Sequence, residues 1–204
     1  MQPPSPAKAL TIHTLGHSNV PVEHFLGLLT QHGVQLVADV RSSPYSKFAV
    51  DYNAAPLKRV LVAAGLAYLY LGQELGGRPP EAEYYDAQGY VLYDRIAASP
   101  RFRSGLEQLL TEAARARVAL LCSEESPAEC HRRLLLARVL AERGVNVLHI
   151  RGDGRVQTEA DVRREAVPAK DRSQQLLFEV EEAPAWKSAH SVSREDQPRN
   201  SSGS

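Results

Sequence analysis

The chain alternates between short apolar runs typical of buried strands and longer segments with the apolar periodicity of helices. The runs at residues 11–15, 34–40, 67–71, 118–122 and 146–150 predict five strands. Between them, apolar residues recur with helical spacing, as in the segment after Pro21 that ends at Gly33. Because strands that alternate with helices form mostly parallel sheets, we expect an α/β fold with about five strands covered by helices.

The length of the chain suits one domain with a tail. Of its 204 residues, 43% are apolar, which is enough for one ordinary hydrophobic core. We expect an extension at residues 1–10, an α/β domain at 11–152, a C-terminal segment at 153–182 and a disordered polar tail at 183–204. The long stretch at 72–100, rich in proline, glycine and tyrosine, is typical of a functional loop, with a helical part around 90–97.

Composition excludes several classes of protein. Acidic and basic residues balance at 24 each, so the chain lacks the overall field expected of a protein that coats nucleic acid. No segment approaches the roughly 20 apolar residues of a membrane span, and the first residues lack the apolar centre of a signal peptide. Its two cysteines are too few for a disulfide scaffold. We therefore expect a soluble, cytoplasmic protein with free thiols and no membrane contact.

Polar residues and glycines gather where the predicted strands end, which is where open parallel sheets form their sites. From this pattern we select six candidate catalytic residues: Cys122, Cys130, His17, His131, Glu124 and Asp39. From the same pattern we select candidate residues for binding a substrate or an anion: Gly16, Ser18, Arg41, Ser46, Gly76, Gly77 and Arg132. The connections at the opposite ends of the strands are plainer. The pattern predicts one shared pocket for a small anionic or nucleotide-like ligand.

The segment 122–133 carries the densest chemistry. Ser126, Pro127 and Glu129 have the spacing of a capping box, which predicts a helix over 127–143. Cys130 and His131 would then lie in its opening turns, where free backbone N–H groups and the helix dipole favour a thiolate or a bound anion.

Other interpretations of these residues remain open. Free cysteines most often fill cores. His17 serves either as an acid–base group oriented by Asp39 or as a local hydrogen-bonding residue, and Asp39 with Arg41 also suits a structural ion pair. Gly76-Gly77 suits a turn. The Cys-x7-Cys-His spacing is not a usual zinc pattern, so we predict no metal site and identify no cofactor, although these side chains could meet in space.

Five segments taken in order resemble a known family. They are Thr14-Leu15-Gly16-His17-Ser18-Asn19, Asp39-Val40-Arg41-Ser42-Ser43-Pro44-Tyr45-Ser46, Leu75-Gly76-Gly77, Leu121-Cys122-Ser123-Glu124 and Cys130-His131-Arg132. Together they are similar to the DUF488 family, a domain of unknown function, over roughly residues 11–152. The resemblance implies an α/β domain in which these polar segments converge, and it supplies no reaction.

The tail offers a candidate partner. The peptide at 174–178, with Gln174, Leu177 and Phe178, is similar to the short motif with which bacterial DNA repair and replication proteins bind the sliding clamp. Packing of the same side chains onto the domain is the alternative. The leading hypothesis is an enzyme with a Cys/His/Arg pocket, linked to DNA maintenance through this peptide. The rival hypothesis is a noncatalytic module that senses nucleotides or recruits a partner.

Overall fold

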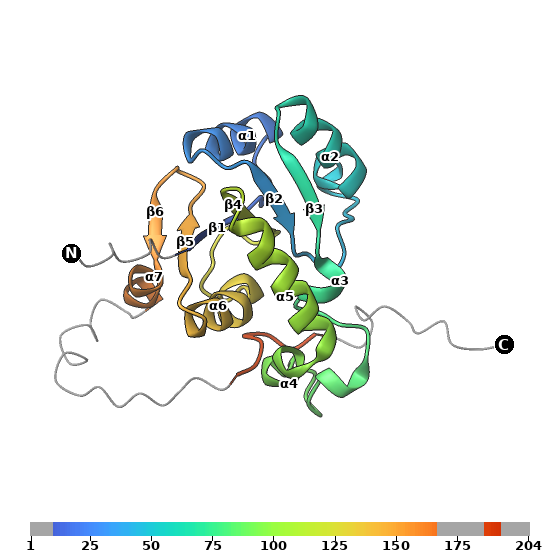
Figure 1. The fold of residues 1–204 in the computed structure, drawn as a ribbon. Helices are drawn as coiled ribbons and strands as arrows, with labels where there is room; N and C mark the ends of the chain where they lie inside the picture. The colour runs from blue at the N-terminus through green and yellow to red at the C-terminus, as the bar shows by residue number, and fades with distance from the viewer. Residues whose placement is uncertain (1–9, 167–185, 193–204) are drawn as a thin grey trace, which may run out of the picture.

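The computed structural model describes residues 10–166 and 186–192 (Figure 1). Within them a single sheet has the strand order β3-β2-β4-β1-β5-β6. The strands are β1 (Thr11–Gly16), β2 (Leu36–Asp39), β3 (Ala67–Tyr70), β4 (Val118–Cys122), β5 (Asn146–Ile150) and β6 (Val156–Thr158). The first five are parallel to their neighbours, and β6 pairs antiparallel with β5. The predicted fold class, α/β with a mostly parallel sheet, is confirmed.

The five predicted strands are all present, and the sixth was missed. Strand β6 is an antiparallel edge strand of only three residues. It lies in the charged stretch after Gly154. Helix α7 (Glu159–Ala166) follows at once. Both elements belong to the segment that the sequence separates from the domain, yet β6 is part of the sheet.

Helices cover both faces of the sheet (Figure 1). Helices α1 (Val22–Gln31) and α2 (Ala54–Ala63) pack on one face, and α5 (Pro100–Ala113) and α6 (Arg138–Glu142) pack on the other. Strand β4 shows why both layers are needed, since successive side chains of a strand point to opposite faces. Leu120 is buried on the side of α5, and Leu121 on the side of α1.

The long stretch between β3 and α5 contains short helices. Helix α3 (Gly72–Leu75) follows β3 directly, a 3-10 turn spans Ala82–Tyr84, and α4 (Tyr93–Ala98) confirms the helical part predicted near 90–97. Another 3-10 turn, Val50–Tyr52, precedes α2. None of the helices that the structure describes is long and apolar enough to cross a membrane.

The helix predicted from Pro127 begins later than the capping box indicates. Residues 127–130 form a turn, a π-helical segment η3 spans Arg132–Ala137, and α6 completes the helix. The Ser126 hydroxyl accepts a hydrogen bond from the backbone of Ala128 (3.3 Å), but the Glu129 carboxylate pairs with His190 instead of returning to Ser126. The capping-box prediction was therefore wrong, and π-helical geometry of this kind is frequent at functional sites.

Part of the tail lies against the domain. Residues 186–192 are described, and the backbone carbonyl of Trp186 accepts a hydrogen bond from the backbone of Tyr93 (2.8 Å). The Trp186 indole donates to the carbonyl of Leu134 (3.2 Å), and Val192 is buried. The prediction of disorder does not hold for these seven residues. The peptide with Gln174, Leu177 and Phe178 lies outside the described residues.

Candidate functional site

The carboxyl ends of β1, β2 and β4 lie side by side, because β4 is inserted between β2 and β1. The backbone N–H of His17 donates to the carbonyl of Cys122 (3.0 Å), and the N–H of Val40 donates to the carbonyl of Leu121 (3.1 Å). Three of the polar segments predicted from the sequence therefore meet at one edge of the sheet, where the strand order places sites in such folds.

Two sulfurs, a carboxylate and an imidazole form a compact group, which we call the sulfur cluster (Cys122, Glu124, Cys130 and His131). The Sγ atoms of Cys122 and Cys130 are 3.2 Å apart and are not bonded to each other. The Glu124 Oε2 atom lies 2.8 Å from Cys122 Sγ and 3.2 Å from Cys130 Sγ. The His131 Nδ1 atom lies 3.5 Å from Cys122 Sγ and 3.9 Å from Cys130 Sγ.

The orientation of His131 is fixed by its other ring nitrogen. Its Nε2 atom donates to the carbonyl of Val40 (3.0 Å), so Nδ1 faces the sulfurs. A Cβ atom on Gly77 would overlap the His131 side chain, so the backbone of Gly77 packs directly on it. Gly77 therefore positions His131 by close backbone approach, which only a residue without a side chain allows.

The two cysteines differ in acidity. The pKa of the Cys122 thiol is lowered to about 6, first by the hydrogen bond from Cys130 and also by His131, against the opposing effect of burial. Burial raises the pKa of Cys130 well above its usual value, and the neighbouring Cys122 raises it further. Burial lowers the pKa of His131, but Cys122 and Glu124 raise it by more. Cys122 is thus the more acidic of the two thiols, and it lies beside an imidazole whose pKa is raised.

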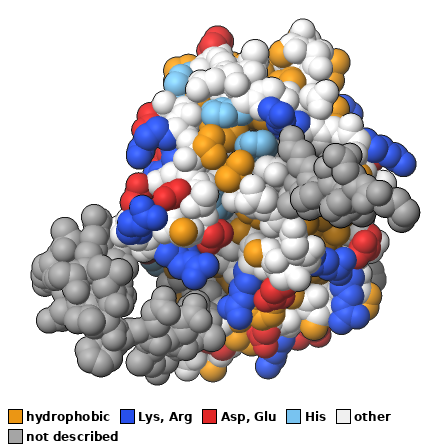
Figure 2. All heavy atoms as spheres, turned by 60° about the vertical axis from the view of Figure 1, so that its left-hand side comes forward, with side chains coloured by type: hydrophobic (Ala, Val, Ile, Leu, Met, Phe, Trp, Pro, Cys, Tyr) orange, Lys and Arg blue, Asp and Glu red, His pale blue; other side chains and the backbone are white. Residues whose placement is uncertain are grey.

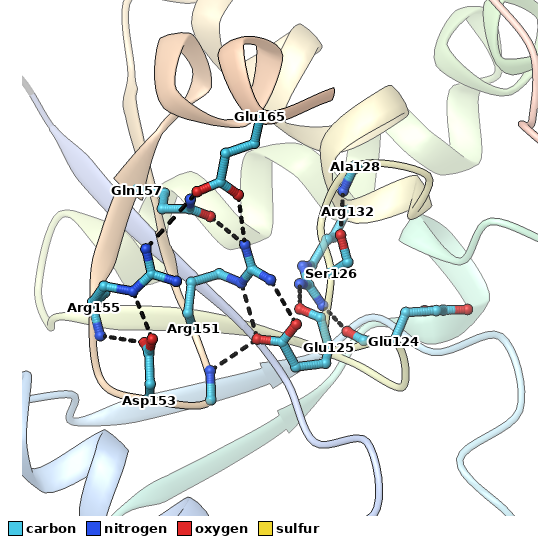
Figure 3. Close-up of polar contacts among 11 residues, drawn as sticks. Glu124, Glu125, Ser126, Ala128, Arg132, Arg151, Asp153, Arg155, Gln157 and Glu165 are labelled. Atoms are coloured by element: carbon cyan, nitrogen blue, oxygen red, sulfur yellow. Dashed lines mark hydrogen bonds and ion pairs between the residues drawn. The ribbon is translucent and has the colours of Figure 1, made fainter. Parts of the chain in front are cut away.

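Arg132 holds the loop that presents Cys122 and Glu124. Its guanidinium donates to the backbone carbonyls of Glu124 and Glu125, as Figure 3 shows, and the side chain is fully buried. A Cβ atom on Gly16 would overlap both the Glu124 carbonyl oxygen and this guanidinium. Gly16 and Arg132, predicted to bind an anion, thus make contacts within the chain that shape the loop.

The same loop is tied to the residues that follow β5. The Glu125 carboxylate accepts two hydrogen bonds from Arg151 (2.9 and 2.7 Å), and Figure 3 shows this pair. It also accepts one from the backbone of Gly152 (2.9 Å). The fork-to-fork geometry of such a pair gives rigidity as well as energy. The loop after β4 is therefore anchored by two arginines, Arg132 at the start of η3 and Arg151 after β5.

A second polar group lies at the ends of β1 and β2. Asp39, with no exposed surface, forms a two-pronged pair with Arg41 (2.9 and 2.6 Å) and accepts a hydrogen bond from the Tyr68 hydroxyl (2.9 Å). Arg41 also donates to His17 Nε2 (3.2 Å). Because arginine cannot accept, His17 carries its proton on Nδ1, which donates to the carbonyl of Ser18 (2.6 Å).

His17 is held neutral in this arrangement. Burial and the adjacent Arg41 lower the pKa of His17 to about 4. Its ring stacks on Tyr52, with centroids 4.1 Å apart. Both ring nitrogens have partners within the protein, and Arg41 is 5% exposed. The geometry favours the structural interpretation of Asp39, Arg41 and His17 that the sequence left open.

The remaining predicted residues shape loops. Ser18 adopts a left-handed backbone (φ 45°), and its N–H donates to the carbonyl of Ser123 (2.8 Å). The Ser46 hydroxyl accepts hydrogen bonds from the backbones of Phe48 and Ala49 (both 3.1 Å). Both residues thus contact the chain itself, in the loops that follow β1 and β2.

Two further residues lie near the sulfur cluster, and of these Tyr93 was missed as a site candidate. Tyr93 is buried, and burial followed by the charges of Cys130 and Cys122 raises the pKa of its hydroxyl. Arg78 is exposed, directly follows Gly77, and its backbone N–H donates to the Ser42 hydroxyl (2.8 Å). Both come from the long stretch after β3. Arg78 directly follows the Gly76-Gly77 turn near the strand end, whereas the position of Tyr93 in the sequence gives no signal.

The cluster also contains a set of possible metal ligands. Within the described ranges, the ligand atoms of Cys122, Cys130 and His131 all lie within 4.8 Å of one another, although their spacing in the sequence predicts no site.

Over the face drawn in Figure 2, acidic and basic side chains are interspersed, as the balanced charge of the chain leads one to expect.

Comparison with known proteins gives a family. The family model described as "Domain of unknown function DUF488" matches residues 21–139, which is more than half of the chain. No curated protein and no solved structure matches the chain.

Proposed function

Because the chain belongs to the DUF488 family, whose description gives no function, we propose a function from the site alone. The proposed function is an enzyme that acts on a small anionic or nucleotide-like substrate at the sulfur cluster. The observation that carries the proposal is the meeting of four ionisable side chains, with two sulfurs 3.2 Å apart, at the carboxyl end of β4.

A packing role does not account for this group. Cysteines that merely fill a core need apolar neighbours, whereas Cys122 and Cys130 are buried against a carboxylate and an imidazole. Burying several ionisable groups together costs stability unless each is paired. Groups that are buried, coupled and strongly shifted in pKa gather at functional sites. Cys122, Glu124 and His131 are the residues to which we assign the chemistry.

The substrate class follows from the charge beside the cluster. Arg78 forms no ion pair within the described residues and is exposed, while its neighbour Gly77 packs on His131. A guanidinium in this position suits a phosphate or carboxylate group of a substrate. Arg41 and Arg132 are engaged within the protein, so we assign anion binding first to Arg78. His17 and Asp39 position Arg41 in this proposal.

Ligand-induced stabilisation tests the substrate class. Nucleoside 5′-monophosphates and inorganic phosphate at millimolar concentration should raise the melting temperature of the full chain, and uncharged nucleosides should raise it less. Arg78→Ala should remove the difference. Arg59→Ala, which changes an exposed arginine on α2, should retain it. Equal stabilisation of the Arg78 variant, or none of the wild type by any anion, contradicts this part of the proposal.

Turnover separates an enzyme from a noncatalytic nucleotide-sensing module. Mass spectrometry of the same monophosphates after incubation should reveal a converted product with the wild type and none with Cys122→Ser. Binding without conversion of any probe would favour the sensing module. Conversion that survives Cys122→Ser would move the reaction away from the sulfur cluster.

A further inference from the structure

We propose that Cys122, Cys130 and His131 bind a zinc ion through three ligands, leaving a fourth position for water next to Glu124. The inference rests on the proposed function, because it names the reactive group of the same site. It assigns the sulfurs as ligands, and it assigns Glu124 as the base that takes a proton from the bound water.

The distances between the ligand atoms suit a tetrahedral ion. Zinc bonds of about 2.3 Å to sulfur and about 2.05 Å to nitrogen give tetrahedral edges of about 3.8 Å between sulfurs and about 3.6 Å between sulfur and nitrogen. The two sulfur–nitrogen distances, 3.5 and 3.9 Å, bracket the expected edge. The sulfur–sulfur distance of 3.2 Å is shorter. Binding therefore requires the two sulfurs to separate by about half an ångström.

The ligands are already oriented by their surroundings. The hydrogen bond from His131 Nε2 to the Val40 carbonyl is the usual outer support of a metal-binding histidine, and it leaves Nδ1 for the ion. Cys122 is fixed by β4, while Cys130 ends the turn before η3 and its N–H donates to the Pro127 carbonyl (3.2 Å). The three ligand atoms thus come from a strand end, a turn and the start of a helix.

Charge balance favours a divalent cation. When both cysteines bind the ion as thiolates, they and the Glu124 carboxylate carry three negative charges. Arg132 supplies one positive charge, is fully buried, and has no carboxylate partner in the part of the chain that the structure describes. A zinc ion supplies the other two. Sulfur and imidazole ligands also select zinc over magnesium or calcium, which prefer oxygen.

The chemistry implied is hydrolytic. Three Cys or His ligands with an open fourth position, and a glutamate that is not a ligand, form a set that activates water in zinc enzymes. Glu124 would take one proton from water, and the water oxygen would bond to an electrophilic carbon or phosphorus of the substrate. As the bond to the leaving group breaks, Glu124 would return the proton to it. No oxidant or reductant is needed.

Metal content of the intact, reduced chain tests the site directly. After loading with zinc and dialysis, the wild type should retain one zinc per chain. Cys122→Ser, Cys130→Ser and His131→Ala should each lose it. Glu124→Gln should retain it, and so should His24→Ala, which removes an exposed histidine on α1. Stoichiometric zinc in both cysteine variants, or none in a folded wild type, would overturn the inference.

Cobalt substitution keeps the test independent of variants that fail to fold. Wild type loaded with Co²⁺ should show strong visible bands of a tetrahedral ion and near-ultraviolet absorption from thiolate-to-cobalt charge transfer. Weak bands typical of six oxygen ligands would contradict the site. If no metal binds but turnover still depends on Cys122, the zinc inference fails and the proposed enzymatic function is retained. If zinc binds but no anion binds through Arg78 and no probe is converted, the zinc is structural and the proposed function fails.

Discussion

Buried, neutral His17 should make the stability of the fold depend on pH in a defined window. Its pKa is lowered from 6.5 to about 4, first by burial and then by Arg41, and the side chain is only 5% exposed. Between pH 6.5 and about pH 4, His17 binds a proton in the unfolded chain but not in the folded chain. The contribution of His17 is therefore complete above pH 6.5 and is lost as the pH falls toward 4. At ~1.4 kcal/mol per pKa unit, the full loss is roughly 3 kcal/mol, and about 2 kcal/mol of it has occurred by pH 5.

Urea denaturation at several pH values between 7.5 and 4.5 measures this loss. His17→Phe retains a ring that can stack on Tyr52 but cannot titrate. The free energy of unfolding of the wild type should fall by about 2 kcal/mol more than that of the variant between pH 7 and pH 5. His24→Asn, at an exposed position, should follow the wild type. Parallel curves for wild type and His17→Phe would refute the assignment of His17 as a buried neutral group.

Three further predictions concern the loop after β4 and the tail. Gly16→Ala should destabilise the chain by about 3 kcal/mol or more, because its Cβ would overlap a backbone carbonyl. Gly27 lies in α1, and a Cβ atom there would meet nothing within 4 Å, so Gly27→Ala should stabilise the chain by up to about 1 kcal/mol in the same urea titration. Equal effects of Gly16→Ala and Gly27→Ala would contradict the packing of Gly16. Trp186→Ala should cost about 2 kcal/mol through its lost hydrogen bond and cation–π contact, and a change below about 0.5 kcal/mol would mean that the tail does not pack there. Pull-down with a bacterial sliding clamp should succeed with the intact chain and fail with the Leu177→Ala/Phe178→Ala variant, and equal capture of both would remove the docking hypothesis.

The sheet could be predicted from the sequence because buried parallel strands need continuous apolar runs. The run at residues 118–122 became β4 with the same bounds, since it is buried on both faces. Strand β6 could not be predicted in this way. Its three residues include Gln157, and its register depends on hydrogen bonds to β5 that no local pattern encodes. The start of the helix after Cys130 was misplaced for a similar reason, because Glu129 found a distant partner in His190.

The place of the site was predictable, but the partners of its residues were not. Strand ends locate Cys122, His17 and Asp39 at one edge, because parallel strands share their direction. Whether Arg41 faces a ligand or Asp39 depends on side-chain geometry, and the structure places its guanidinium on the carboxylate. Tyr93 approaches the cysteines from a helix whose position relative to the sheet is set only by packing.

Gly16, Arg132 and the loop after β4 come from three separate motifs and depend on one another for their positions. The absence of a side chain at Gly16 leaves room for Arg132, and Arg132 holds the carbonyls of the loop that presents Cys122 and Glu124. A larger residue at 16 or a shorter one at 132 would displace the loop backbone and so move the side chains of Cys122 and Glu124. The glycine and the arginine are therefore required for the shape of the site, whatever ligand it binds. Variants at these two positions should impair the sulfur cluster as strongly as variants within it.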